Sequence, residues 1–135
     1  MRFVDTNVLL YAISSAPAEK AKAERAAALL NASDLALSVQ VLEEFYVQAT
    51  RPSAGPSISH ESATAFIATL LRFPVQEMTL PLVHAASDAR VRWQISYWDA
   101  AIVEAARALG CEAVCSEDLQ PGQDFAGIRI VNPFA

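Results

Sequence analysis

Short apolar runs alternate along the chain with longer segments whose apolar residues recur at helical spacing. The apolar runs predict strands at residues 2–4, 35–38, 75–80, 112–116 and 128–131. The longer segments predict helices at residues 8–13, 18–31, 39–50, 61–72, 81–93 and 97–109. Because strands that alternate with helices form parallel sheets, we expect an α/β fold with about five mainly parallel strands. No repeat or change in composition marks a second unit, so residues 1–135 are expected to form a single domain.

Residues that favour helix ends mark several of these boundaries. Ser38 and Ser59 stand where a side chain can cap the following helix, and Pro81 stands at the expected first position of another. Gly110 is expected to end the last helix. Residues 51–57 contain two prolines and one glycine, so they are predicted to form a loop that could act as a mobile flap.

The composition is that of a globular protein with a sizeable core. Apolar residues make up 53% of the chain and charged residues 19%, which argues against extensive disorder. No segment approaches the roughly 18 apolar residues of a membrane helix, and the N-terminus lacks the pattern of a signal peptide. Cys111 and Cys115 have a C-x3-C spacing typical of neither a redox pair nor a zinc site, so we interpret them as small core residues. We therefore expect a cytoplasmic protein without membrane contact.

The first candidate for chemistry is Asp5, which follows the first predicted strand. The turn Asp5-Thr6-Asn7 connects this strand to the helix that is expected to begin at Val8. Ligand sites of open α/β folds collect at the carboxyl ends of the strands, where such a side chain lies. Asp5 or Thr6 could instead only cap the helix, as both residue types commonly do at a strand-to-helix turn. Asp5 alone therefore decides nothing about function.

Glu43 and Glu44 lie in the first turns of the helix after the second strand, at the same predicted edge as Asp5. A helical wheel leaves the two glutamates on opposite flanks of the apolar stripe, which consists of Val41, Leu42, Phe45, Tyr46 and Ala49. The wheel does not choose between them. Either could also be an exposed residue that the helix N-terminus favours.

Two more aspartates are expected at this edge. Asp99 stands in the first turn of the last predicted helix, which could lie close to the sheet because it carries Ala100, Ala101, Ala105 and Ala106. Ser96 and Asp99 also match the capping-box pattern, which explains them without any site. Asp118 follows the strand that ends at Ser116, and this repeats the position of Asp5 after the first strand. The alternative for Asp118 is an ordinary turn aspartate.

Four carboxylates brought to one edge would repel each other without a cation. Mg²⁺ and Mn²⁺ prefer oxygen ligands, activate water and neutralise charge on a phosphate, so the set favours metal-assisted phosphodiester hydrolysis. The net charge of -5, from 15 acidic and 10 basic residues, is opposite to the basic surface expected of a nucleic-acid binder. Bound divalent cations would reconcile this charge with a phosphate substrate.

These acids occur in four segments that resemble the motifs of the PIN-domain ribonucleases, most closely the VapC-type toxins of bacterial toxin–antitoxin pairs. The segments are Phe3-Val4-Asp5-Thr6-Asn7, Ser38-Val39-Gln40-Val41-Leu42-Glu43-Glu44-Phe45, Trp98-Asp99-Ala100-Ala101-Ile102 and Cys115-Ser116-Glu117-Asp118-Leu119. Their order and spacing cover essentially the whole chain and make the resemblance specific. It implies a three-layer PIN-like fold with helices on both faces of the sheet, Mg²⁺ or Mn²⁺ as cofactor, and the catalytic acids Asp5, Glu44, Asp99 and Asp118.

Within this set the resemblance separates the metal ligands from the fourth acid. The implied ligands are Asp5, Asp99 and Asp118. Glu44 is preferred over Glu43 because the family's glutamate usually stands directly before an aromatic or leucine residue, here Phe45.

Three further motif residues are implied as supports. Thr6 and Ser116 would supply hydroxyls that hold carboxylates or water, and the Asn7 amide would orient the turn. Ser116 stands where many relatives have Thr. The neighbouring Glu117 leaves the assignment of Asp118 as a ligand less certain.

The resemblance implies an endoribonuclease that leaves 5′-phosphate and 3′-hydroxyl ends and acts as a toxin. A cognate antitoxin would wrap it and present an arginine or lysine to the active site, and the toxin would pair as a homodimer. The helices at 18–31 and 59–72 could contact such partners, or they could simply pack on the sheet. The alternatives are a housekeeping RNA-processing nuclease and a non-catalytic module of the same fold that binds RNA or protein.

Two other protein families share a strand-end aspartate but lack support in this sequence. Haloacid-dehalogenase phosphatases and receiver domains also begin with a strand-end aspartate, but the former need Asp-x-Asp, where this chain has Asn7. Both also use a late lysine, and none follows Lys22 here.

Charged and aromatic residues outside the motifs are interpreted mainly as structural. Lys22 is expected on a solvated helix face, and His60 and His84 as surface or core residues far from the acids. Tyr97 and Trp98 could stack bases, but Trp98 is predicted to lie in the core. The candidates for contacts with a nucleic-acid backbone are Arg51, Arg90 and Arg92.

Overall fold

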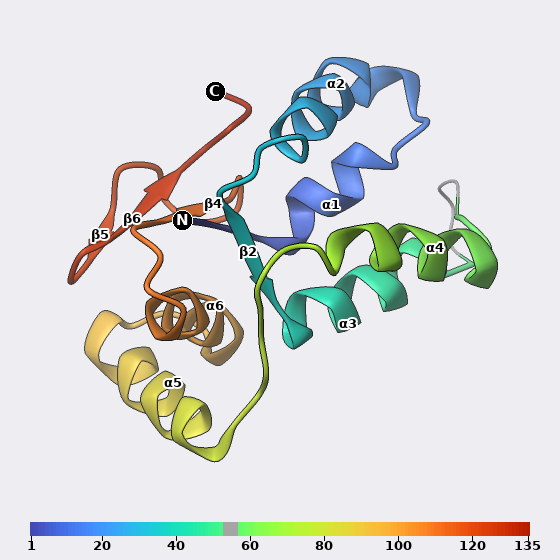
Figure 1. Cartoon of the computed structure of the whole chain (residues 1–135). Helices are drawn as coiled ribbons and strands as arrows, with labels where there is room; N and C mark the ends of the chain where they lie inside the picture. The colour runs from blue at the N-terminus through green and yellow to red at the C-terminus, as the bar shows by residue number, and fades with distance from the viewer. Residues whose placement is uncertain (53–56) are drawn as a thin grey trace.

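The computed structural model describes residues 1–52 and 57–135, which form a six-stranded sheet with helices around it (Figure 1). The strand order is β3-β2-β1-β4-β6-β5. The strands are β1 Arg2–Val4, β2 Leu35–Ser38, β3 Val75–Gln76, β4 Ala113–Cys115, β5 Asp124–Phe125 and β6 Ile128–Val131. All pairs are parallel within the described residues except that of β5 with β6. The expected mainly parallel α/β fold is confirmed, with one strand more than predicted.

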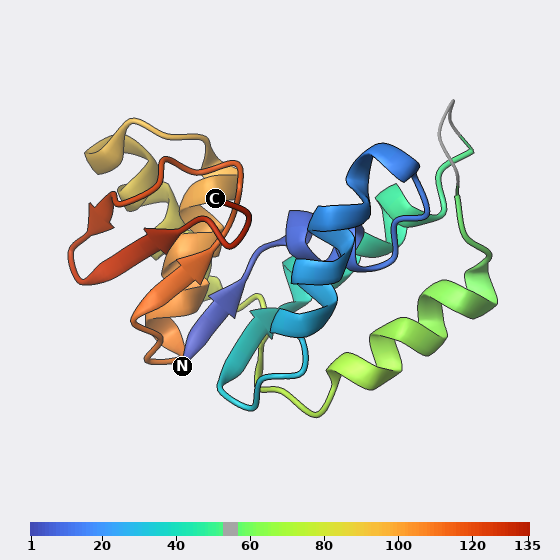
Figure 2. The ribbon, with the colours of Figure 1, turned by 90° about the horizontal axis from the view of Figure 1, so that it is seen from above.

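Helices cover both faces of this sheet. They are α1 Thr6–Ala12, the 3-10 helix η1 Pro17–Glu19, α2 Lys20–Leu29, α3 Val39–Ala49, α4 His60–Leu70, α5 Leu80–Trp93 and α6 Tyr97–Ala108. Figure 1 shows α5 and α6 on one side of the sheet and α1 and α2 on the other. Both views place α4 beside α3 and away from α5 (Figure 2). In the described parts of the chain, every helix falls short of the length and apolar character needed to cross a bilayer.

The centre of the sheet is fully buried. All residues of β2 are buried, and Phe3 and Val4 of β1 and Val114 of β4 have no exposed surface. Strands that are covered on both faces are continuous apolar runs, which is why these three were readily predicted. Val4 pairs with Cys115, so the carboxyl ends of β1 and β4 lie level with each other.

Alanines allow α6 to pack closely on two sides. Ala105 and Ala106 belong to the main core, whereas Ala100 and Ala101 pack in a second cluster with alanines of α5. The expectation that these alanines bring α6 close to the sheet therefore holds for Ala105 and Ala106, whereas Ala100 and Ala101 serve the contact with α5. This packing fixes the start of α6, where Asp99 lies.

Several predicted element boundaries were wrong for local reasons. α1 begins at Thr6, because Asp5 caps it by accepting a hydrogen bond from the Thr6 amide at 2.7 Å. The third strand ends at Gln76 and does not extend to residue 80, because Thr79 caps α5. Pro81 is consequently the second residue of that helix.

The missed strand is β5, which forms a tight antiparallel hairpin with β6. Its turn contains Ala126 and Gly127 with positive φ angles, and only two residues precede it in the strand. So short a run gives no recognisable period.

Other boundary predictions are confirmed or lie outside the described residues. Ser38 and Ser59 cap α3 and α4 through their side chains. Gly110 follows α6 with a φ of 76°, which suits glycine. The predicted loop at 51–57 includes residues 53–56, which the structure does not describe.

The alanine cluster between α5 and α6 gives a test of the fold. Ala101→Leu should destabilise the protein by about 1–3 kcal/mol, because Ala101 has no exposed surface and the larger side chain would force the helices apart. The control is Ala108→Leu, which makes the same change at an exposed position of α6. Urea unfolding midpoints measure both, and equal midpoints would contradict this packing.

Candidate active site

The four predicted acids lie around one pocket of about 130 Å³. Asp5 follows β1, Glu44 lies in α3, Asp99 lies in the first turn of α6, and Asp118 follows β4. The rest of the lining consists of Thr6, Asn7, Leu10, Gln40, Gln48, Trp98 and Ile102. Four elements that are distant in sequence therefore bring the acids to the carboxyl edge of the sheet.

Asp5 is the most buried of these acids, with 8% of its surface exposed. Its Oδ1 accepts the Thr6 amide at 2.7 Å, and its Oδ2 accepts the Ser116 hydroxyl at 2.8 Å. Asp5 is thus both a helix cap and part of the pocket, so the two roles weighed from the sequence coexist. Burial raises the pKa of Asp5 to about 6, the hydrogen bonds oppose this rise, and Glu44 and Asp118 add to it.

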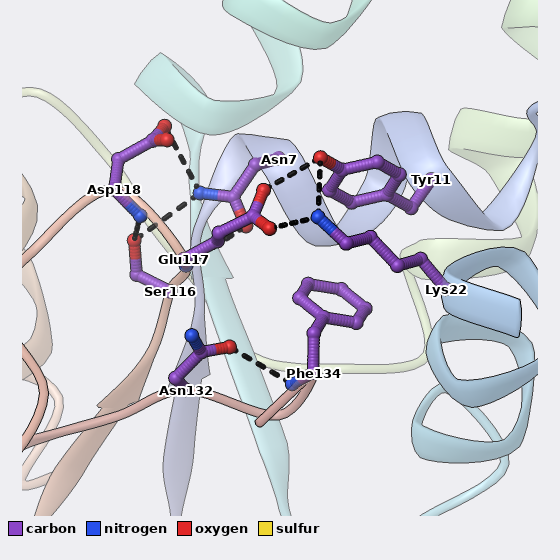
Figure 3. A network of polar contacts seen from close by, with 8 residues as sticks. All are labelled: Asn7, Tyr11, Lys22, Ser116, Glu117, Asp118, Asn132 and Phe134. Atoms are coloured by element: carbon purple, nitrogen blue, oxygen red, sulfur yellow. Dashed lines mark hydrogen bonds and ion pairs between the residues drawn. The ribbon is translucent and has the colours of Figure 1, made fainter. Parts of the chain in front are cut away.

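Asn7 links three polar groups of the site through one amide, and Figure 3 shows its contacts with Ser116 and Asp118. Its Nδ2 lies 3.4 Å from Asp5 Oδ2 and 3.2 Å from both Ser116 Oγ and Asp118 Oδ2. Its Oδ1 accepts a hydrogen bond from the Glu117 amide at 3.3 Å. Asn7 therefore does more than orient its own turn, because it ties the start of α1 to the segment after β4.

Glu44 is the glutamate that faces the pocket. Glu43 is exposed, whereas Glu44 is partly buried and lines the pocket. The Thr6 hydroxyl donates to Glu44 Oε1 at 3.2 Å, and the Gln40 amide nitrogen lies 3.4 Å from the same oxygen. Burial raises the pKa of Glu44, while these two hydrogen bonds lower it and the nearby Asp99 raises it further. The structure separates two residues that the helical wheel left equivalent.

Asp99 makes only half of the capping box. Its amide donates to Ser96 Oγ at 3.0 Å. Across residues 1–52 and 57–135, the Asp99 carboxylate forms no hydrogen bond with protein, so it is available to the pocket that it lines. The capping and site interpretations are therefore compatible here as well.

Glu117 is held away from the pocket by a separate network, which Figure 3 shows. The Tyr11 hydroxyl donates to Glu117 Oε2 at 2.6 Å, and Lys22 forms an ion pair with Oε1. Lys22 also lies over the rings of Tyr11 and Phe134, at 4.9 and 5.9 Å from their centroids. Lys22, and then Tyr11, hold the pKa of Glu117 below its ordinary value. Lys22 was expected on a solvated face, and its side chain is 40% exposed but also pairs with Glu117. Asp118 is the acid that lines the pocket.

The donor set suits a hard cation, but the side chains do not converge on one point. In the described residues, no three acidic, histidine or cysteine side chains stand close enough together to hold a metal ion. The polar lining residues carry carboxylate, amide and hydroxyl oxygens, which are the ligands that Mg²⁺ and Mn²⁺ prefer.

Comparison with known proteins places the chain in a family. A family model described as PIN domain matches residues 2–123. The chain belongs to the PIN-domain family. No curated protein matches it significantly by sequence.

Solved structures share the PIN fold with this chain. A toxin–antitoxin complex from Klebsiella pneumoniae contains a chain with 17% identity and a TM-score of 0.73, covering 98% of each chain. The Mycobacterium tuberculosis toxin VapC20, described as cleaving the sarcin-ricin loop, has 24% identity and a TM-score of 0.66, covering 84% of this chain and 87% of its own. DNA-bound VapBC from Salmonella typhimurium has 22% identity and a TM-score of 0.64, covering 96% and 95%.

Three lining residues of this PIN domain were missed or misplaced from the sequence. Gln40 and Gln48 were not considered, although Gln40 precedes Glu44 by one helical turn and could have been found by that spacing. Gln40 is 5% exposed, and its Oε1 has no hydrogen-bond partner among the described residues. Trp98 is 61% exposed and lines the pocket, so its predicted place in the core was wrong.

Residues with weaker predictions lie elsewhere. His60 and His84 are exposed, as expected, and neither lines the pocket. In the part of the chain that the structure describes, no arginine lines the pocket. Arg92 stacks on Trp93, with its guanidinium carbon 4.4 Å from the ring centroid. Cys111 and Cys115 are free and buried, which confirms them as core residues.

The raised pKa of Asp5 gives a prediction about pH. Between its ordinary pKa of 3.8 and its folded value of about 6, the folded state binds the proton more tightly than the unfolded state, so this group's contribution to stability falls as pH rises through that window. The unfolding free energy of Asp5→Asn minus that of the parent should therefore be larger at pH 7.5 than at pH 4 in the metal-free protein, by up to roughly 3 kcal/mol.

The measurement is the difference in unfolding free energy between Asp5→Asn and the parent across pH 4 to 7.5, with a chelator present. Glu43→Gln is the control, because it removes one negative charge at an exposed position of the neighbouring helix. A difference for Asp5→Asn that does not change with pH would show that Asp5 is not destabilised by burial.

Proposed function

We propose that this PIN domain is a metal-dependent endoribonuclease that acts as the toxin of a toxin–antitoxin pair. The observation that carries the proposal is the meeting of Asp5, Glu44, Asp99 and Asp118 around one pocket from four separate elements. Two structural neighbours support the same proposal, because one is described as a toxin–antitoxin complex and the other as a toxin that cleaves the sarcin-ricin loop.

Asp5, Asp99 and Asp118 are proposed to hold Mg²⁺ or Mn²⁺. When bound, such an ion would activate a water molecule and neutralise charge developing on the scissile phosphate. The hydrogen bonds from Ser116 and Thr6 fix both oxygens of Asp5, and Asn7 positions Asp118. These supports order Asp5 and Asp118, whereas the three carboxylates would still have to move closer together to hold one ion.

Glu44 is the residue proposed to accept a proton from the attacking water. Its raised pKa suits a general base better than that of a free glutamate, because proton transfer is most effective near the working pH. Thr6 and Gln40 both engage Oε1, which fixes the carboxylate and leaves Oε2 for the water. Attack on the phosphate would leave a 5′-phosphate and a 3′-hydroxyl.

The test of catalysis is RNA cleavage with defined ends. The parent should cut RNA in Mg²⁺ or Mn²⁺ and stop with chelator, and Asp5→Asn should lose at least about 100-fold in rate because one of the charges that hold the ion is lost. Glu43→Gln should retain activity. Sequencing of 5′ ends after brief expression would identify the target.

The non-catalytic alternative makes the opposite prediction. A PIN module that only binds RNA would show no cleavage above that of Asp5→Asn in either metal. That result would leave the family assignment intact and remove the enzymatic proposal.

A cognate antitoxin is the proposed partner, and the toxin is proposed to be a homodimer. The pocket carries four acids and no basic residue, so it is complementary to a cationic side chain. α2 packs against α1 and buries only Ala26, and α4 packs against α3 and buries only Ala63 and Leu70, so the outer faces of both helices remain available. Leu71, directly after α4, is 58% exposed.

Co-expression tests the partner. The chain expressed alone should arrest growth of its native host, and expression with the neighbouring small open reading frame should restore growth, because a bound antitoxin would block the pocket. Asp5→Asn, expressed to the same level, is the control for toxicity unrelated to catalysis. Harmless expression of a chain that still cleaves RNA in vitro would instead favour a housekeeping RNA-processing nuclease.

A further inference from the structure

Trp98 is a large aromatic side chain left in solvent beside an acidic pocket. It is 61% exposed, whereas Phe3, Phe45 and Phe125 have no exposed surface. It is the second residue of α6, adjacent to Asp99, and both line the pocket. We propose that Trp98 is a stacking platform for an unpaired nucleobase of the RNA whose phosphate enters the pocket, a proposal that rests on the proposed nuclease function.

The backbone at Trp98 is held by contacts within the protein. Its carbonyl oxygen accepts a hydrogen bond from the buried Gln40 amide at 3.2 Å, and Ser96 caps the helix that carries it. Its ring meets that of Tyr97 edge to face, with centroids 5.0 Å apart and planes at 87°. Such a contact covers at most one face of the indole, so at least one face remains open to a base.

The charge of the pocket favours recognition of a base over recognition of phosphates. The lining contains four acids and neither lysine nor arginine, and Arg92 is engaged with Trp93 in a different cavity together with Arg107. Apart from the proposed cation, no positively charged group among the described residues of the lining attracts the RNA backbone. Stacking on an aromatic ring does not depend on charge, and its removal typically weakens binding by about 5- to 150-fold per base.

Stacking on Trp98 would favour unpaired RNA over duplex RNA. In a duplex each base is already stacked on its neighbours and its edge is paired, so its face cannot reach an indole without being unstacked. Asp99 and Trp98 line the same pocket, so the proposed platform lies beside the proposed position of the phosphate. The ligand is therefore an unpaired nucleotide that flanks the scissile phosphate, in a single strand or a loop.

The test pairs a protein variant with an altered RNA. With a short single-stranded oligoribonucleotide in Mg²⁺, Trp98→Ala should raise KM by about 5- to 150-fold, and Trp98→Phe should recover most of that loss. Replacing the flanking nucleotide by an abasic ribose should weaken the parent by a similar factor and change Trp98→Ala little, because the two alterations remove the same contact. Leu80→Ala, at a residue that is 68% exposed and does not line the pocket, should match the parent.

The outcomes separate this proposal from the function on which it rests. If Trp98→Ala cleaves with unchanged KM, or if its effect multiplies with that of the abasic ribose, the platform is overturned while activity lost in Asp5→Asn still supports the nuclease. Loss of antitoxin binding by Trp98→Ala with unchanged KM would assign the exposed ring to a protein contact and also overturn the platform. Absence of RNA cleavage by the parent would overturn both proposals.

Discussion

A carboxylate buried at the end of the central strand is the most demanding feature of this structure. Asp5 lies between β2 and β4 at the carboxyl edge, and an ionised group in that position is costly unless other groups compensate for the lost water. The Thr6 amide and the Ser116 hydroxyl compensate in part, yet the pKa of Asp5 remains raised. The proposed cation would relieve the remaining cost of ionising Asp5.

The first helix carries most of the supports that this carboxylate and its neighbours need. Thr6 reaches Glu44 of α3, Asn7 reaches Ser116 and Asp118, and Tyr11 reaches Glu117. Asn7 and Tyr11 are four residues apart and thus lie on one side of α1, which faces the segment after β4. In that segment Asp118 lines the pocket, whereas Glu117 pairs with Lys22. A single short helix therefore forms hydrogen bonds with residues from distant parts of the chain.

Local signals explain what could be predicted from the sequence, and long-range contacts explain what could not. The buried strands and the caps at Ser38 and Ser59 were predictable because each depends on a few adjacent residues. Glu44 could not be separated from Glu43 by a wheel, since the choice depends on Thr6, which is 38 positions away. The ion pair of Lys22 was missed because its partner is 95 positions away, and Trp98 was misplaced because apolar character alone does not show which helix face meets the sheet.

The sheet is bounded at both edges by strands of only two residues, β3 and β5. Unpaired backbone groups at the edge of a sheet can recruit strands from other molecules, and the hazard grows with the length of the exposed edge. Here each edge presents little backbone, and Glu77 follows one of them directly. A chain with 53% apolar residues thereby keeps its strongly apolar central strands out of reach of intermolecular pairing and aggregation.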